Sequence, residues 1–158
     1  MLIRRFRPED AAETSAMVAR TLRTVNINDY TPEFIEETVA ALSPEVLVKR
    51  NEEGHLYVLT EEGAIIGCGG IAGYWGSLTE SILLSVFIAP ECEGKGYGRQ
   101  LIDTLEQDEI FLRSERIEIA ASVTALGFYQ KLGYGFKNSD PTPDDEGHIR
   151  LEKFRSVS

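Results

Sequence analysis

The sequence predicts an α+β fold, with a mixed and mostly antiparallel central sheet flanked by helices on both faces. Segments whose apolar residues alternate with period two are interspersed with segments of helical spacing. A Glu-Glu-Gly turn joins two of the strand segments, as in an antiparallel hairpin. A strand, a glycine-rich loop and a helix then follow one another at 81–113. The 158 residues have the length of one domain, 1–158, and can bury a sizeable core.

The N-terminal half reads as one strand followed by three helices. Proline inside the first turn marks each expected helix start, in Pro8-Glu9-Asp10, Thr31-Pro32-Glu33 and Ser43-Pro44-Glu45. The last two triplets add a Thr or Ser that can cap the helix. The expected elements are strand 2–6, an amphipathic helix to about Leu22, a polar loop 23–30, helix 31–41 and a short helix from Ser43.

The remaining elements alternate between strands and helices. A hairpin pattern comes first, and the central strand follows it. The expected elements are strands 55–60, 64–74 and 81–89, helix 97–113, strand 116–121, helix 122–132 and a final antiparallel pair, 133–138 with 147–154.

The loop at 88–99, Ile-Ala-Pro-Glu-Cys-Glu-Gly-Lys-Gly-Tyr-Gly-Arg, carries the strongest functional signal. Glycines let the backbone approach a ligand closely, and a helix N-terminus favours anions, so we expect a phosphate or pyrophosphate ligand there. A Walker loop is excluded because Gly96, not Ser or Thr, follows Lys95. A dinucleotide fingerprint fails because its third glycine falls one residue early. A tight turn that merely caps a helix is the plain structural alternative.

A second motif lies about thirty residues further on, Ala-Ser-Val-Thr-Ala-Leu-Gly-Phe-Tyr-Gln-Lys-Leu-Gly-Tyr at 121–134. It resembles the second signature of the GNAT acyltransferase superfamily, and the glycine loop resembles that family's acetyl-CoA motif. The two motifs and the helix between them cover 81–136, about a third of the chain. The resemblance implies an N-acetyltransferase, a transferase that uses acetyl-CoA as cosubstrate and needs no metal. It also implies a GNAT-like fold in which the two central strands splay apart to admit the pantetheine arm.

The resemblance places the coenzyme on three segments. Backbone groups of the central strand offer an edge to the pantetheine amides, the loop binds the diphosphate, and a residue after the next strand contacts pantetheine. The cofactor-binding residues expected are Val86, Phe87, Ile88, Glu93, Gly94, Lys95, Gly96, Tyr97, Gly98, Arg99 and Ser122. Two of them depart from the family pattern. Glu93 replaces Gln or Arg, which predicts weakened coenzyme affinity, and Ser122 (or Ala120) replaces Asn; as an N-cap, its oxygen is open to use by its own helix.

Tyr129 is the expected catalytic acid, because the family places its general-acid tyrosine at this position. A phenol with a pKa near 10 is protonated at neutral pH and can supply the proton that the departing CoA thiolate needs. The alternative is packing alone, since Ala125, Phe128, Tyr129 and Leu132 share one helical face.

The general base is less clearly marked. Some relatives carry Glu where this chain has Ile82, and Glu80 lies two residues earlier on the same strand face, from which it could pass a proton through water. The alternative for Glu80 is a solvated carboxylate at a strand end. His55 and His148 stand at expected strand starts with no partner pattern that makes either one a catalyst.

Composition limits the partners. The net charge of −10, from 16 Lys and Arg against 26 Asp and Glu, argues against nucleic acid and would attract an amine or a basic peptide, although acidity that merely aids solubility explains it as well. Cys68 and Cys92 read as free thiols in a reducing cytoplasm. No segment has 18 uninterrupted apolar residues, so we expect no membrane partner. The sequence is also compatible with a homodimer.

The expected acceptor is a small-molecule or peptide amine. Tyr30, Phe34, Tyr74 and Trp75 are candidate walls of its pocket, and ordinary packing explains each of them equally well. A non-catalytic acyl-CoA sensor is the alternative function. An unrelated nucleotide-binding domain is disfavoured by the loop spacing.

Overall fold

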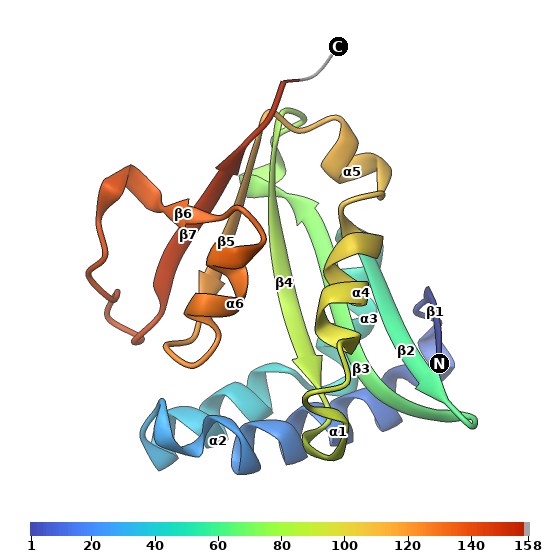
Figure 1. Ribbon diagram of the computed structural model, residues 1–158. Coiled ribbons are helices and arrows are strands. Elements are labelled where there is room, and N and C mark those ends of the chain that lie inside the picture. The colour runs from blue at the N-terminus through green and yellow to red at the C-terminus, as the bar shows by residue number, and fades with distance from the viewer. Residues whose placement is uncertain (157–158) are drawn as a thin grey trace.

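The computed structural model describes residues 1–156, which build a seven-stranded sheet with helices on both faces (Figure 1). The strand order is β1-β2-β3-β4-β5-β7-β6, and among the described strands only β4 and β5 pair in parallel. This confirms the mixed, mostly antiparallel sheet. The strands are β1 Leu2–Arg5, β2 His55–Glu61, β3 Ala64–Gly73, β4 Glu80–Ile88, β5 Arg116–Ala121, β6 Gly135–Phe136 and β7 Ile149–Phe154.

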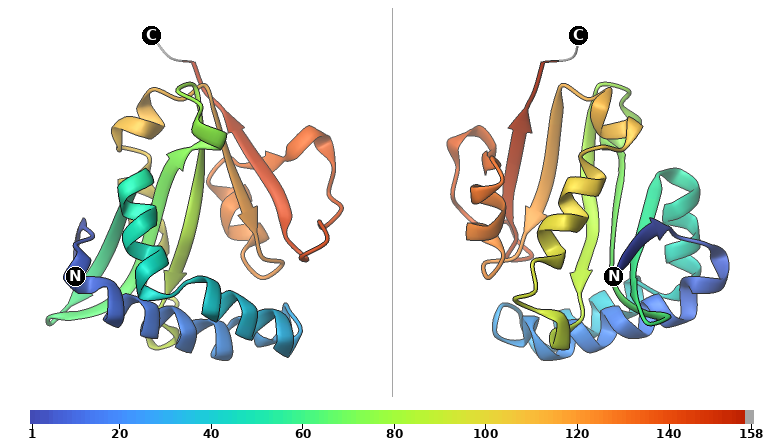
Figure 2. Two further views of the ribbon diagram at one scale, coloured as in Figure 1. Left: turned by 180° about the vertical axis from the view of Figure 1, so that it is seen from behind. Right: turned by 45° about the vertical axis from the view of Figure 1, so that its right-hand side comes forward.

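Within residues 1–156 the chain forms six α-helices, which surround this sheet on both faces and at one end. Figures 1 and 2 show the arrangement from the front and from behind. One face carries α4, α5 and α6, whereas α3 lies on the other face and α1 and α2 cross the end of the sheet. Their bounds are α1 Ala11–Thr24, α2 Pro32–Ala41, α3 Pro44–Glu53, α4 Tyr97–Leu105, α5 Glu109–Leu112 and α6 Leu126–Lys131. Thr31 and Ser43 cap α2 and α3 through their hydroxyls, as their positions before proline predict.

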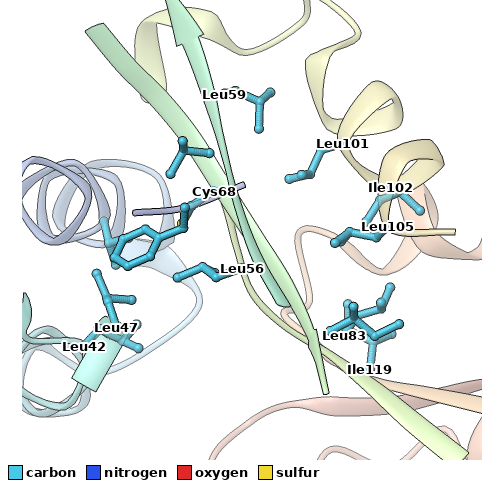
Figure 3. Packing of buried hydrophobic residues seen from close by; sticks show 14 of the residues in the cluster. Leu42, Leu47, Leu56, Leu59, Cys68, Leu83, Leu101, Ile102, Leu105 and Ile119 are labelled. Atoms are coloured by element: carbon cyan, nitrogen blue, oxygen red, sulfur yellow. The ribbon is translucent and has the colours of Figure 1, made fainter. Parts of the chain in front are cut away.

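The core has two layers, one on each side of the sheet (Figure 3). Leu101, Ile102 and Leu105 of α4 are fully buried in one layer. Leu47 of α3, Cys68 of β3 and Leu56 of β2 lie in the other layer. No helix within residues 1–156 combines the length and the apolar character needed to span a bilayer.

β4 carries a bulge that separates it from β5. Leu84 pairs with Gly70 and Phe87 pairs with Cys68, so two residues of β4 stand opposite the single Gly69. Ser85, at the bulge, has a φ of +54°. Pairing with β5 ends at Leu83, and Figure 1 shows the two strands diverging beyond that point. The expected splay is therefore present.

The helix expected at 97–113 is wrong as a single element. α4 ends at Leu105, and Asp108 starts α5 by accepting a hydrogen bond from the backbone of Ile110 at 2.8 Å. The same buried carboxylate accepts the Tyr57 hydroxyl at 2.6 Å and lies 2.8 Å from Nδ1 of His55. These tertiary contacts fix Asp108 as a cap, which helical spacing alone does not reveal.

Two other boundaries are shorter than expected. The helix placed at 122–132 begins at Leu126, after a turn in which Ser122 caps the backbone of Ala125. The final antiparallel pair keeps only the two residues of β6 against β7. The intervening segment, 137–148, is mostly irregular.

Candidate active site

A cavity of about 960 Å³ opens where β4 and β5 diverge. The glycine loop, α6 and the ends of both strands border it, together with α2 and part of α3. It brings together most of the residues singled out from the sequence. Those that line it are Val86, Phe87, Ile88, Glu93, Gly94, Gly96, Tyr97, Gly98, Arg99, Ser122 and Tyr129.

The glycine loop presents a row of unused backbone donors. Within residues 1–156, the N–H groups of 94–99 donate to no backbone or side-chain acceptor, and no side chain caps α4. Gly94 and Gly96 have φ of +78° and +79°, a conformation that glycine adopts without strain. A Cβ at either position would meet nothing within 4 Å, so this face of the loop is open. Such a cradle at a helix N-terminus fits a diphosphate.

Two side chains of the loop are held by Glu61 at the end of β2. The Tyr97 hydroxyl donates to Glu61, and Nζ of Lys95 lies 3.8 Å from the same carboxylate. Lys95 is not among the cavity-lining residues, unlike Arg99. The loop therefore offers its main chain and Arg99 to the cavity, whereas the expectation of a direct Lys95 contact has no support in this arrangement.

The edge of β4 that faces β5 is unpaired along its second half. Phe87 and Ile88 pair with Cys68 and Gly67 of β3, so their strand is anchored on one side only. Toward β5, regular pairing stops at Leu83. An extended amide-bearing chain has room to pair with the free edge, as the resemblance implies for Val86, Phe87 and Ile88.

Tyr129 of α6 is buried, with 5% of its surface exposed, yet its hydroxyl has no hydrogen-bond partner within residues 1–156. The chain has six tyrosines, and the hydroxyls of Tyr57, Tyr74, Tyr97 and Tyr134 are all paired. The two without a partner, Tyr30 and Tyr129, both line the cavity.

The Tyr129 ring itself packs as a core side chain. It makes edge-to-face contacts with Phe128 and Tyr134, at centroid distances of 5.1 and 6.1 Å. Burial raises the pKa of Tyr129 above its ordinary value. The packing and catalytic interpretations are therefore compatible. The ring is fixed in the core, and within residues 1–156 the protonated hydroxyl has no partner and is available to a ligand.

Glu80 lies outside this cavity. Its carboxylate accepts a hydrogen bond from Arg116 at 3.0 Å, in a charged cluster on the sheet face away from α4. A second hollow of about 400 Å³ borders that cluster, and Tyr74 and Trp75 line it rather than the main cavity. The structure thus brings neither Glu80 nor this aromatic pair alongside Tyr129.

The end of the main cavity formed by α2 and the segment before β7 is aromatic. The rings of Tyr30, Phe34 and His148 pack together, with centroids 4.8 to 5.9 Å apart. Nδ1 of His148 lies 3.7 Å from the carboxylate of Glu146, which also lines the cavity. Tyr30 and Phe34 are placed as candidate acceptor walls, and His148 joins them although its sequence pattern gave it no role.

Sequence reasoning missed two further cavity residues, Arg50 and Ser85. Nη1 of Arg50 in α3 donates a hydrogen bond to the Ser85 hydroxyl at the bulge. The sequence contains no signal for either residue, since Arg50 follows ordinary helical spacing and a serine rarely adopts a positive φ. Within residues 1–156, no group of three or more His, Cys, Asp or Glu side chains is placed to hold a metal ion.

Comparisons with known proteins agree with this geometry. The acetyltransferase (GNAT) domain family matches residues 52–135, more than half of the chain. No curated protein matches the sequence. Among solved structures, a GCN5-related N-acetyltransferase from Rhodopseudomonas palustris is similar at 23% identity and a TM-score of 0.78, covering 98% of this chain and 95% of its own.

Two further structures share the fold and were solved with coenzyme A bound. The PaiA N-acetyltransferase of Thermoplasma acidophilum has a TM-score of 0.78 at 18% identity, with 98% of each chain covered. An aminoglycoside 6'-N-acetyltransferase has a TM-score of 0.70 at 18% identity, covering 98% of this chain and 97% of its own. These likenesses concern the fold, and the family match concerns the sequence itself. The chain therefore belongs to the GNAT acetyltransferase family.

Proposed function

We propose that the protein is an N-acetyltransferase that moves the acetyl group of acetyl-CoA to a primary amine. One observation carries the proposal. The unpaired hydroxyl of Tyr129 lines the same cavity as the unused N–H groups of the glycine loop. Transfer of an acyl group from coenzyme A requires an acid near the departing sulfur and a binding site for the diphosphate, and this cavity contains a candidate for each.

The coenzyme would be bound mainly by main-chain atoms. The N–H groups at 94–99 would hold its diphosphate, with Arg99 adding positive charge. The free edge of β4 at 86–88 would pair with the pantetheine amides. Ser122 would donate its hydroxyl hydrogen to pantetheine, while its oxygen accepts the Ala125 N–H at 3.2 Å.

The reaction would proceed by direct attack. The amine nitrogen forms a bond to the thioester carbonyl carbon, and the carbon–sulfur bond of the tetrahedral intermediate then breaks. The sulfur leaves with the bonding electron pair and takes the hydroxyl proton of Tyr129. The nitrogen loses its surplus proton to water, and the phenolate of Tyr129 takes a proton back from water. Burial raises the pKa of this phenol, so it is fully protonated at neutral pH. The proton would move as charge develops on sulfur rather than before it.

Deprotonation of the amine has no assigned base. Glu80 is tied to Arg116 outside the cavity, so it would act only through bridging water. An α-amine with a pKa near 8 needs little help at neutral pH, whereas a lysine-like amine near 10.4 does. Acceptors of low pKa therefore suit this site.

The buried, unpaired thiols of Cys68 and Cys92 fit a reducing compartment, and we propose that the protein acts in the cytoplasm. Small-molecule and peptide acceptors are both compatible with the size of the cavity.

The test combines binding with turnover. Calorimetry with coenzyme A should detect binding at micromolar to millimolar concentration. Thiol release from acetyl-CoA should then require an amine from a panel of α-amines, diamines and short peptides. Binding without thiol release across the whole panel would favour the alternative function, a non-catalytic acyl-CoA sensor. No binding at millimolar coenzyme would contradict both functions.

A further inference from the structure

Arg50 is a partly buried arginine that lines the cavity and has one neutral hydrogen-bond acceptor and no carboxylate partner within residues 1–156. Five arginines are partly buried, namely Arg4, Arg50, Arg116, Arg150 and Arg155. Three of them pair with carboxylates, and Arg155 donates to three backbone carbonyls. Arg50 donates only to the neutral hydroxyl of Ser85, and within residues 1–156 no carboxylate lies within 4 Å of it.

This arrangement is costly for the folded protein. A partly buried cation without an anionic partner loses part of its hydration, and no carboxylate offsets that loss. Burial accordingly lowers the pKa of Arg50, although the group stays charged at neutral pH. A ligand carboxylate would supply the missing partner, and the guanidinium fork is suited to bind one with two parallel hydrogen bonds.

The position of Arg50 separates it from the coenzyme cradle. It reaches the β4 bulge from α3, on the sheet face opposite α4 and α6, which carry the glycine loop and Tyr129 (Figure 2). On its own face the cavity is walled by α2 and by the ends of β5 and β7, including Thr38, Ala120 and Arg150. Arg150 is already held by Asp144 and Glu118, at 3.1 and 3.3 Å. Among the cavity-lining residues on that face, Arg50 is therefore the cation available to bind a ligand carboxylate.

We infer that Arg50 binds a carboxylate of the acceptor, so that the substrate is an aminocarboxylate such as a free amino acid rather than a polycationic amine. This inference rests on the proposed function, since it names the acceptor class of the same site.

Matched acceptors test this directly. The probes are the standard α-amino acids, β-alanine and 4-aminobutyrate, each compared with its carboxamide, which has nearly the same shape and no charge. Thiol release from acetyl-CoA gives kcat/KM for each pair. We expect the wild type to prefer the carboxylate of the best pair by about tenfold or more. Because an amino acid amide has the less basic and more available amine, intrinsic reactivity works against this result.

Variants assign the preference to the guanidinium. Arg50→Met should abolish the preference by raising the KM of the carboxylate, and Arg50→Lys should retain part of it. Lys49→Met, which removes an exposed cation from the same helix, should leave it unchanged. Arg50→Met should also melt at the same temperature as the wild type or higher, because it removes an unpaired buried charge.

The outcomes distinguish the inference from the function on which it rests. Equal kcat/KM for acid and amide in the wild type, or a preference that survives in Arg50→Met, would overturn the inference while leaving an active acetyltransferase. A fall in kcat for acid and amide alike would also overturn it, by assigning Arg50 to the oxyanion of the intermediate. If no amine is turned over, calorimetry of the same acid and amide pairs with coenzyme A present decides, with tighter binding of the acids to wild type than to Arg50→Met supporting the inference.

Discussion

The amino group of Lys137 lies 2.8 Å from Oε1 of Glu118, a carboxylate with no exposed surface in the middle of β5. Arg116 donates to the same oxygen from two residues earlier on the strand, and Arg150 approaches Oε2 at 3.3 Å. Glu118 is thus surrounded by three cations on the sheet face that Arg50 also reaches. This cluster joins β5, β7 and the turn after β6 through charged side chains.

Neutralising this carboxylate should destabilise the fold strongly. Glu118→Gln removes the carboxylate that all three cations share. Arg116 and Arg150 keep other carboxylates, but within residues 1–156 Lys137 keeps none, so we expect a loss of about 3–5 kcal/mol in the free energy of unfolding. Denaturation in urea measures it. Glu36→Gln is the matched control, because it breaks an exposed pair with Arg23 and should cost under about 1 kcal/mol. Equal losses in the two variants would contradict the importance of burial.

The same carboxylate should make stability depend on acid pH. Burial alone would raise the pKa of Glu118, but the hydrogen bonds from Lys137 and Arg116 outweigh burial and hold the pKa below its ordinary value. A lowered folded-state pKa gives stability that is complete above the unfolded pKa, near 4.3, and is lost as pH falls below it. The free energy of unfolding should therefore decline below about pH 4.5, and the decline should be shallower in Glu118→Gln. Parallel curves for the two proteins would refute this assignment.

Removing the Tyr129 hydroxyl should affect turnover and not binding. Tyr129→Phe keeps the ring packed against Phe128 and Tyr134 but deletes the proton donor. We expect kcat to fall about tenfold or more, with coenzyme A affinity near the wild-type value. Tyr134→Phe, which removes a hydroxyl bound to Glu106 outside the cavity, is the control. An unchanged kcat in Tyr129→Phe would exclude the phenol from the chemistry.

The carboxylate of Glu93 should weaken coenzyme binding. It lines the cavity at the start of the glycine loop, where a diphosphate would bring like charge close to it. Two unit charges about 6 Å apart in water repel by about 0.7 kcal/mol, so Glu93→Gln should lower the Kd of coenzyme A about threefold. The gain should shrink as salt is added. Glu115→Gln, at an exposed position that does not line the cavity, should change nothing.

The left-handed backbone at Gly96 should be essential to the cradle. Gly96→Ala has free space for its methyl group, so its cost is conformational, about 1–2 kcal/mol, and any shift of the loop would misalign the N–H donors. Both stability and coenzyme affinity should fall. Gly127→Ala, at a helical position in α6 with equally free space, should instead stabilise the protein by about 0.5–1 kcal/mol. Thermal melts and calorimetry on both variants measure the contrast.

Local patterns were enough to predict the architecture. The proline-marked helix starts, the hairpin and the strand–loop–helix unit depend on nearest neighbours in sequence, and each is present. The break at Asp108 could not be predicted, because its carboxylate is fixed by His55 and Tyr57 from a distant strand. Residue type and helical spacing give no information on such a contact.

The candidate site divides in the same way. The glycine loop and Tyr129 belong to contiguous motifs, and both prove to line one cavity. Glu80, Tyr74 and Trp75 were placed by strand alternation and loop position, and ion pairing to Arg116 and a separate hollow hold them elsewhere. Arg50 and Ser85 are 35 residues apart in sequence and form a hydrogen bond at the β4 bulge. The positive φ at this bulge belongs to a serine, so no glycine or asparagine in the sequence indicates it. Their encounter depends on the packing of α3 against the sheet.

Because β4 and β5 diverge, the second half of β4 has unpaired backbone N–H and C=O groups in the middle of the sheet. Such unpaired edges normally occur only at the outer strands of a sheet. An extended coenzyme arm would pair with these backbone groups in the way that an additional strand would. Ligand occupancy would then act as a folding constraint, with stabilisation that grows with the logarithm of coenzyme concentration. The lifetime of this protein in a cell would accordingly follow the supply of the coenzyme, whether or not it carries an acyl group.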